Sequence, residues 1–118
     1  MQEVRNESAF AVIKRDGSVV TWGSSSGGGD SSSVASELSS GVSQIYSNQN
    51  AFAALKTDGS VVTWGSSSGG GDSSSVASEL SSGVSQIYSN QDAFAALKTD
   101  GSVVTWGDSR YGGQPSIQ

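Results

Sequence analysis

The side chains of this sequence that could do chemistry are aspartates and lysines that recur at a fixed spacing. Asp16, Asp58 and Asp100 each precede a glycine, and Lys56 and Lys98 stand two residues before the second and third of them. Aligned carboxylates could act as general acids or bases. An Asp-Gly pair between apolar segments is, however, a hairpin signal, and turn chemistry accounts for each aspartate. The lysines fit solvated positions at the strand edge.

Bulk composition narrows the function classes further. The 118 residues include no histidine and no cysteine, so the many serines lack the commonest general base, and the redox compartment cannot be predicted. We therefore predict no enzyme activity, no catalytic residue, no cofactor and no metal site. A net charge of −5 with six scattered basic residues argues against a nucleic-acid partner. No apolar run reaches membrane-spanning length, so no membrane partner is expected.

Two glycine-rich patterns resemble ligand-binding motifs without their spacing. Asp30 and Asp72 each follow three glycines, but calcium-binding repeats need glycine and aspartate alternating over several turns. The run 69–71 is not followed by the Gly-Lys-Ser/Thr of a phosphate loop. We interpret both patterns as loops, with the aspartate capping the segment that follows.

Three tryptophans occupy equivalent positions at the ends of apolar segments. They could stack on a sugar, but core packing is favoured, and we expect all three to be buried alike. The glycines of the three turns are the other residues to which we assign a structural role. The predicted structural residues are Trp22, Trp64, Trp106, Gly17, Gly59 and Gly101.

The segment 51–65, AFAALKTDGSVVTWG, recurs as 93–107 and, in a looser form, as 9–23. Two apolar halves around Asp-Gly predict a β-hairpin with a two-residue type I′ turn, which needs positive φ at both Asp58 and Gly59. That register places Ala53 opposite Trp64, on one face of the hairpin. Both faces are apolar, so we expect the hairpin to be a middle layer covered on each side.

The hairpins belong to a tandem repeat. Residues 23–64 and 65–106 are one 42-residue unit that differs only at Asn50 and Asp92. A period of this size is typical of propellers, solenoids and arrays, and the near-identity indicates recent duplication or design. We predict a single repeat domain, 1–118, made of a partial repeat 1–22, the repeats 23–64 and 65–106, and a C-terminal tail 107–118.

The rest of each unit connects one hairpin to the next. In 72–82, Val76 and Leu80 are four residues apart and Gly83 follows, which predicts a helix of about two turns. An irregular turn or a fourth strand is the alternative, because serine has low helix propensity. Residues 84–88 follow as a strand. One unit is thus three strands plus a short helix or an edge strand, and residues 1–8 supply a more polar first strand.

The segment TDGSVVTWG resembles the repeat of the regulator of chromosome condensation family. The likeness lies in the small apolar run 53–55, the Asp-Gly turn 58–59 and the strand ending in Trp-Gly at 61–65. Residues 111–113, Tyr-Gly-Gly, are similar to the Gly-rich loop that follows in the family repeat. It implies a mainly β fold of propeller blades, one blade per repeat; an open β-rich solenoid is the alternative. Family members act as nucleotide-exchange factors, ubiquitin-ligase modules or sensors.

Two functions compete for such a chain. The first is a non-catalytic structural or self-assembling module whose partner is itself. Three hairpins are too few to close a propeller like those of the family, so we expect a homo-oligomer, and a ring rather than a filament, because 1–8 and the tail around Pro115 resemble a seam. The second is a binding module that takes a protein or a carbohydrate at its loop tips. The sequence does not predict the cellular localisation.

Overall fold

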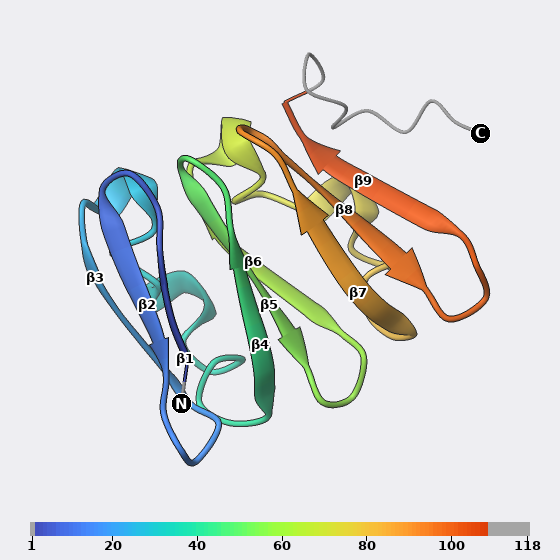
Figure 1. Ribbon diagram of the computed structural model, residues 1–118, viewed down its shortest axis with the longest axis horizontal. Coiled ribbons are helices and arrows are strands. Elements are labelled where there is room, and N and C mark those ends of the chain that lie inside the picture. The colour runs from blue at the N-terminus through green and yellow to red at the C-terminus, as the bar shows by residue number, and fades with distance from the viewer. Residues whose placement is uncertain (1, 109–118) are drawn as a thin grey trace.

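The computed structural model describes residues 2–108 as three antiparallel sheets that lie side by side like a fan (Figure 1). Each sheet is one blade with its three strands in chain order. The strands are β1 (Gln2–Arg5), β2 (Ala9–Ile13), β3 (Val19–Gly23), β4 (Val42–Ser47), β5 (Ala51–Lys56), β6 (Val61–Gly65), β7 (Val84–Ser89), β8 (Ala93–Lys98) and β9 (Val103–Gly107). The predicted mainly β, propeller-like architecture is confirmed. The tail lies outside the described residues from 109 onward.

Two linkers, 24–41 (linker 1) and 66–83 (linker 2), join the blades. Each holds two single 3₁₀ turns: η1 (Ser25–Gly27) and η2 (Ser32–Val34), then η3 (Ser67–Gly69) and η4 (Ser74–Val76). The predicted two-turn helix over 72–82 is wrong. The irregular alternative holds, because serine side chains and the Asp72 carboxylate, which accepts the Ser74 N–H at 3.0 Å, compete with helical bonding.

The apolar pair in linker 2 nevertheless behaves as predicted. Leu80 N–H donates to the Val76 carbonyl at 3.1 Å, which closes one helical turn, and both side chains are buried. The Leu80 carbonyl then accepts the Val61 N–H at 2.9 Å. Linker 2 is therefore hydrogen-bonded to the free edge of β6 at Val61.

The hairpin loops contain three residues, not two. Leu55 pairs with Val61, Lys56 N–H donates to the Ser60 carbonyl at 2.9 Å, and Gly59 N–H donates to the Lys56 carbonyl at 3.0 Å. Gly59 has φ of 85°, and no residue other than glycine has a positive φ among the described residues. The predicted type I′ turn is therefore wrong. In a three-residue loop only the last position needs the left-handed region.

Because of this difference in register, each residue of the hairpin has a different cross-strand partner from the predicted one. Trp64 lies opposite Phe52, and Val62 lies opposite Ala54, so these four share one face, while Ala53 lies on the other. The predicted pairing of Ala53 with Trp64 is wrong by one residue. Because side chains alternate along a strand, a shift of one residue exchanges the two faces.

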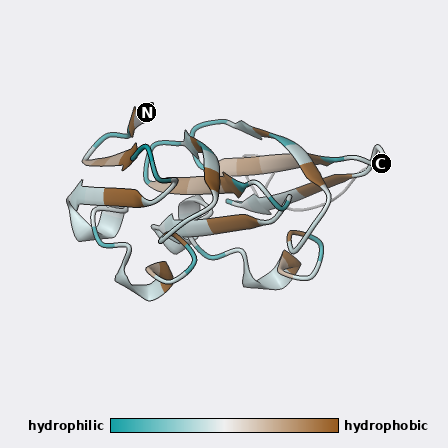
Figure 2. Cartoon of the chain, turned by 90° about the horizontal axis from the view of Figure 1, so that it is seen from below, coloured by the Kyte–Doolittle hydropathy of each residue, from teal (hydrophilic) through white to brown (hydrophobic). Residues whose placement is uncertain are grey.

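The core lies between the blades rather than inside one. One apolar cluster fills the joint between blades 1 and 2, and a second fills the joint between blades 2 and 3. Figure 2 shows the apolar stretches concentrated on the strands. Strand β5 is buried on both faces from Ala51 to Leu55, so the prediction that the hairpin is a covered middle layer is confirmed for blade 2.

Candidate interaction surfaces at the two ends of the blade stack

Each blade has two apolar faces that differ in composition. The first, which we call the Trp face, carries the stacked Phe-Trp pair of the hairpin; the second, which we call the Ala face, carries the alternate positions. The Trp faces are Phe10, Val12, Val20 and Trp22 in blade 1, Phe52, Ala54, Val62 and Trp64 in blade 2, and Phe94, Ala96, Val104 and Trp106 in blade 3. The Ala faces are Ala9, Ala11, Ile13 and Val19, then Ala51, Ala53, Leu55 and Val61, then Ala93, Ala95, Leu97 and Val103.

The two joints are built in the same way. The Trp face of blade 2 packs on the Ala face of blade 1 together with Leu38 and Val34 of linker 1. The Trp face of blade 3 packs on the Ala face of blade 2 together with Leu80 and Val76 of linker 2. Each joint is therefore directional, with a Trp face always meeting an Ala face.

The tryptophan is the anchor of each joint. The Trp64 ring stacks on Phe52 with centroids 5.4 Å apart, and its indole Nε1 donates to the Gly28 carbonyl of linker 1 at 3.0 Å. A Cβ at Gly28 would lie 2.5 Å from the Phe52 ring, so glycine is required where the linker crosses it. Trp106 repeats both contacts in blade 3, with Gly70 as the acceptor. A tryptophan whose N–H is paired can be fully buried, and both are 2% exposed.

Trp22 departs from the predicted equivalence. Its ring stacks on Phe10 at 5.2 Å, as in the other blades, yet it is 45% exposed, and so is Val20 beside it. Within the described residues no linker precedes blade 1 to cover this face. The prediction that all three tryptophans are buried alike is thus wrong for Trp22, and the Trp face of blade 1 is open.

The opposite end of the stack is open as well. Val103 and Tyr88 are 57% and 56% exposed, whereas their equivalents in blade 2, Val61 and Tyr46, pack against the second apolar cluster. The Tyr46 hydroxyl donates to Gln86 Oε1 of blade 3 at 2.9 Å. Burial, and secondarily the neighbouring Tyr88, raises the pKa of Tyr46. The Ala face of blade 3 is therefore the counterpart that the open Trp face lacks.

Polar contacts also cross the joints along the inner strands β1, β4 and β7. Ser47 Oγ donates to the Arg5 carbonyl at 3.0 Å, and Ser89 Oγ donates to the Ser47 carbonyl at 2.9 Å. Main-chain bonds run in the other direction, from Glu7 N–H to the Gln49 carbonyl at 3.3 Å and from Gln49 N–H to the Gln91 carbonyl at 3.0 Å. These contacts repeat every 42 residues and set the position of each blade relative to the last.

The predicted turn glycines lie at the hairpin tips. The Gly17 and Gly59 carbonyls accept the N–H groups of Val42 and Val84, at 3.0 and 2.9 Å, and so hold the first residue of the next blade. A Cβ at Gly101 would meet nothing within 4 Å. Thus two of the three tips contribute to a joint, which the turn signal alone did not predict.

Sequence reasoning missed a structural asparagine in each blade. Asn48 Oδ1 accepts the N–H groups of Asn50 and Ala51, at 3.0 and 2.9 Å, while its Nδ2 donates to the Gly69 carbonyl of linker 2. Asn6 and Asn90 hold the same turn in their blades. The available signal was an asparagine at the same position before every hairpin. A side chain that accepts two N–H groups shapes the turn between the first two strands.

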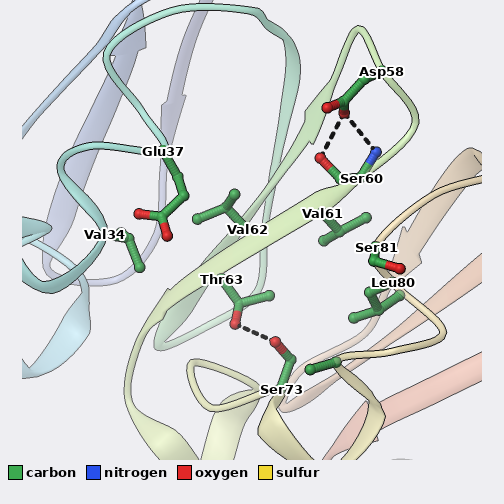
Figure 3. Close-up of a pocket in the computed structure, with 11 residues that line it drawn as sticks. Val34, Glu37, Asp58, Ser60, Val61, Val62, Thr63, Ser73, Leu80 and Ser81 are labelled. Atoms are coloured by element: carbon green, nitrogen blue, oxygen red, sulfur yellow. Dashed lines mark hydrogen bonds between the residues drawn. The ribbon is translucent and has the colours of Figure 1, made fainter.

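A groove of about 420 Å³ lies along β6, between the two linkers (Figure 3). Its apolar lining includes Val34, Val62 and Leu80, and it bears the acidic residues Glu37 and Asp58. Figure 3 shows the Asp58 carboxylate turned back to Ser60, whose hydroxyl and N–H it accepts at 2.6 and 3.0 Å. These two hydrogen bonds lower the pKa of Asp58.

Residues 2–108 contain no group of three or more Asp, Glu, His or Cys side chains that could hold a metal ion. The same residues form no helix of the length and apolarity that a membrane crossing needs. Asp30 and Asp72 each accept the N–H of the serine two residues on, before the second 3₁₀ turn of each linker. The predicted helix cap is not formed, because the cap residues of those turns, Ser31 and Ser73, make no side-chain cap bond.

Comparison with known proteins identifies the fold. No protein-family model and no curated sequence matches the chain. Human WBSCR16 is similar over 96% of this chain, with a TM-score of 0.66 and 22% identity. Yeast RCC1 (Prp20), solved bound to Kap60, is similar over 90%, with a TM-score of 0.61 and 18% identity. Prp20p from Saccharomyces cerevisiae, described with its binding to Gsp1p and histones, is similar over 90% of this chain, with a TM-score of 0.60 and 18% identity.

This chain spans only about a third of those proteins: 35% of WBSCR16 and 29% and 30% of the two Prp20 chains. At these identities the likeness concerns the fold. It agrees with three successive antiparallel sheets, each ending in a Trp-Gly strand. The chain is accordingly three consecutive blades of the RCC1-like β-propeller repeat fold.

Proposed function

We propose that this chain is a non-catalytic structural repeat module that completes its fold by associating head to tail with further copies of itself. One observation carries the proposal. The Trp face and the Ala face that bury each other at both internal joints recur, uncovered, at the two ends of the stack. A second copy offers the matching face to each end.

The near-identity of the units supports this pairing. The Trp face of blade 1 keeps the stacked Phe10 and Trp22, and the Ala face of blade 3 has the same residues as that of blade 2. A joint between copies therefore resembles a joint within one chain. Such a contact is heterologous, and it forms a ring if the rotation closes. Two copies of three blades would supply six blades and three copies nine; we favour a closed ring over a filament.

The test is the mass in solution, measured by light scattering across a range of concentrations. Val20→Lys and Val103→Lys each place a charge on one end face, and both positions are exposed in the single chain, so folding should be kept. Each variant is expected to raise the concentration of half-assembly at least about tenfold, because an unpaired charge is costly to bury. Ser40→Lys, on the exposed part of linker 1, is the matched control. A wild-type monomer at micromolar concentration that unfolds cooperatively would overturn the proposal.

A binding module for a protein or a carbohydrate is the second candidate. The groove along β6 favours it, as do the protein partners named for the two Prp20 structures. Ser81→Trp would fill the groove from its rim without touching either end face. A glycan array and a panel of basic proteins, probed with wild type and with this variant, test the idea. Binding that the variant abolishes would support it, and a wild type without any binding would count against it.

A further inference from the structure

One side-chain contact across the blades distinguishes the first joint from the second. Gln49 Nε2 of blade 2 donates to Glu7 Oε2 of blade 1 at 2.7 Å. Between blades 2 and 3 the corresponding positions are Gln49 and Gln91, which are joined by a main-chain bond at 3.0 Å and by no side-chain bond. A hydrogen bond to a carboxylate is stronger than one between two amides, so the glutamate makes the first joint the more polar of the two.

Glu7 occupies the position that is glutamine in both later blades. A carboxylate only accepts hydrogen bonds, whereas a glutamine amide can donate. Glu7 is exposed, and Gln49 uses one of its two oxygens. No residue between 2 and 108 donates to the other oxygen, so the exposed carboxylate can accept a further hydrogen bond.

Gln91 is the matching group at the other end of the stack. It is exposed, and its main-chain carbonyl is already taken by the Gln49 N–H. Its side-chain amide makes no hydrogen bond within the part of the chain that the structure describes. In a head-to-tail joint, the blade that follows blade 3 is blade 1 of a second copy, so the position opposite Gln91 is occupied by Glu7.

We propose that Gln91 of one copy donates to Glu7 of the next, and that this pair sets the register of the joint between copies. The inference rests on the proposed head-to-tail assembly and adds its specificity-determining residues. The pair has the same chemistry as the hydrogen bond from Gln49 to Glu7 inside the chain. The difference is that the glutamine now belongs to the earlier blade of the joint and the glutamate to the later blade. Glu7 then accepts from a glutamine on each side, which a second glutamate at position 91 would forbid.

A double-mutant cycle on assembly tests the pair. Gln91→Glu sets two carboxylates against each other, and at low salt it should raise the concentration of half-assembly roughly two- to fivefold, the range for exposed charge pairs. Adding Glu7→Lys should return it to the wild-type value or below. Arg5 also lies on the open side, and the cycle cancels whatever it contributes to the single variants. At high salt the differences should shrink, because the pair is exposed.

Gln49→Glu is the internal control. It creates the same clash with Glu7 inside one chain, so it should lower the melting temperature while leaving the concentration of half-assembly near the wild-type value. If the effects of Gln91→Glu and Glu7→Lys simply multiply while the wild type still assembles, the pair is refuted and the head-to-tail assembly stands. A wild type that never assembles would overturn both.

Discussion

Trp22 and Trp64 occupy the same position of the same hairpin and differ in almost everything outside it. Each is the fourth residue of a VVTWG strand, and each stacks on a phenylalanine, at 5.2 and 5.4 Å. Trp64 is 2% exposed and donates to a linker carbonyl, whereas Trp22 is 45% exposed. The hairpin therefore builds its own aromatic stack, but a preceding blade and linker are needed to bury it.

The same contrast holds between the hairpin tips of blades 2 and 3. The Gly59 carbonyl accepts the N–H of Val84, the first residue of the next blade, whereas Gly101 has open space around its α-carbon. Because the buried apolar residues lie in the joints, we expect the joints to contribute more to stability than the single blades do. This is the nearest-neighbour behaviour expected of stacked repeats.

The largest expected effect comes from the aromatic anchors. Phe52→Ala should lower the free energy of unfolding by about 3–5 kcal/mol, because Phe52 is 0% exposed and its loss leaves a cavity in the joint. Phe10→Ala, at the equivalent but half-buried position, should cost less than about 2 kcal/mol. Urea unfolding below the concentration of assembly measures both. Equal losses would mean that the stack within the hairpin, and not the joint, carries the stability.

A middle-sized effect separates the turn glycines. Gly59→Ala and Gly101→Ala both force an alanine to a φ near 85–89°, which costs about 1–3 kcal/mol. At Gly59 the added methyl group would also lie 2.9 Å from the main-chain nitrogen of Gly83, so we expect a further loss of about 1 kcal/mol. Thermal unfolding of the two variants measures the difference. A Gly101→Ala protein as unstable as Gly59→Ala would contradict the role of the tip in the joint.

The smallest effect is acid sensitivity at the tips, where the three blades should behave alike. Serine hydroxyl and N–H donors lower the pKa values of Asp16, Asp58 and Asp100 below 3.8. These bonds therefore stabilise the fold fully above pH 3.8, and the contribution is lost as the pH falls through the lowered values. Melting temperatures recorded from neutral pH to about pH 2.5 should show the loss. Replacing the three aspartates by asparagine should flatten that dependence; an unchanged slope would exclude these carboxylates as its cause.

Much of the fold followed from local patterns. The 42-residue period, the three Asp-Gly hairpins, the apolar pair Val76 and Leu80, and the covered middle blade were all predicted and found. These features depend on turn chemistry and on side chains that alternate every second residue, which are short-range properties. The predicted site was recovered less well. Trp64 and Trp106 are buried anchors, and open apolar ends were expected because three hairpins are too few to close a propeller, but the roles of the asparagines and of Glu7 at the joints were not foreseen.

The failures have separate causes. An Asp-Gly pair is compatible with a two-residue or a three-residue loop. All three hairpins adopt the three-residue loop, including the tip of blade 3, which has open space around Gly101, so the choice is local. At each tip the aspartate carboxylate accepts the N–H of the serine that follows the glycine. That choice placed Trp64 on the face of Phe52 instead of the face of Ala53. The helix over 72–82 does not form because serine side chains and the Asp72 carboxylate compete with helical hydrogen bonding, and the Leu80 carbonyl bonds to the edge of β6 instead.

By itself, the sequence determined that this protein is a set of nearly interchangeable β-hairpin units that are apolar on both faces. Only the tertiary structure decided which face meets which, that both joints run from a Trp face to an Ala face, and that the open ends are the Trp face of blade 1 and the Ala face of blade 3. The physical reason is that identical local sequences have identical local conformations. Burial depends instead on the neighbour, and within residues 2–108 blade 1 and blade 3 each have one neighbouring blade, whereas blade 2 has two.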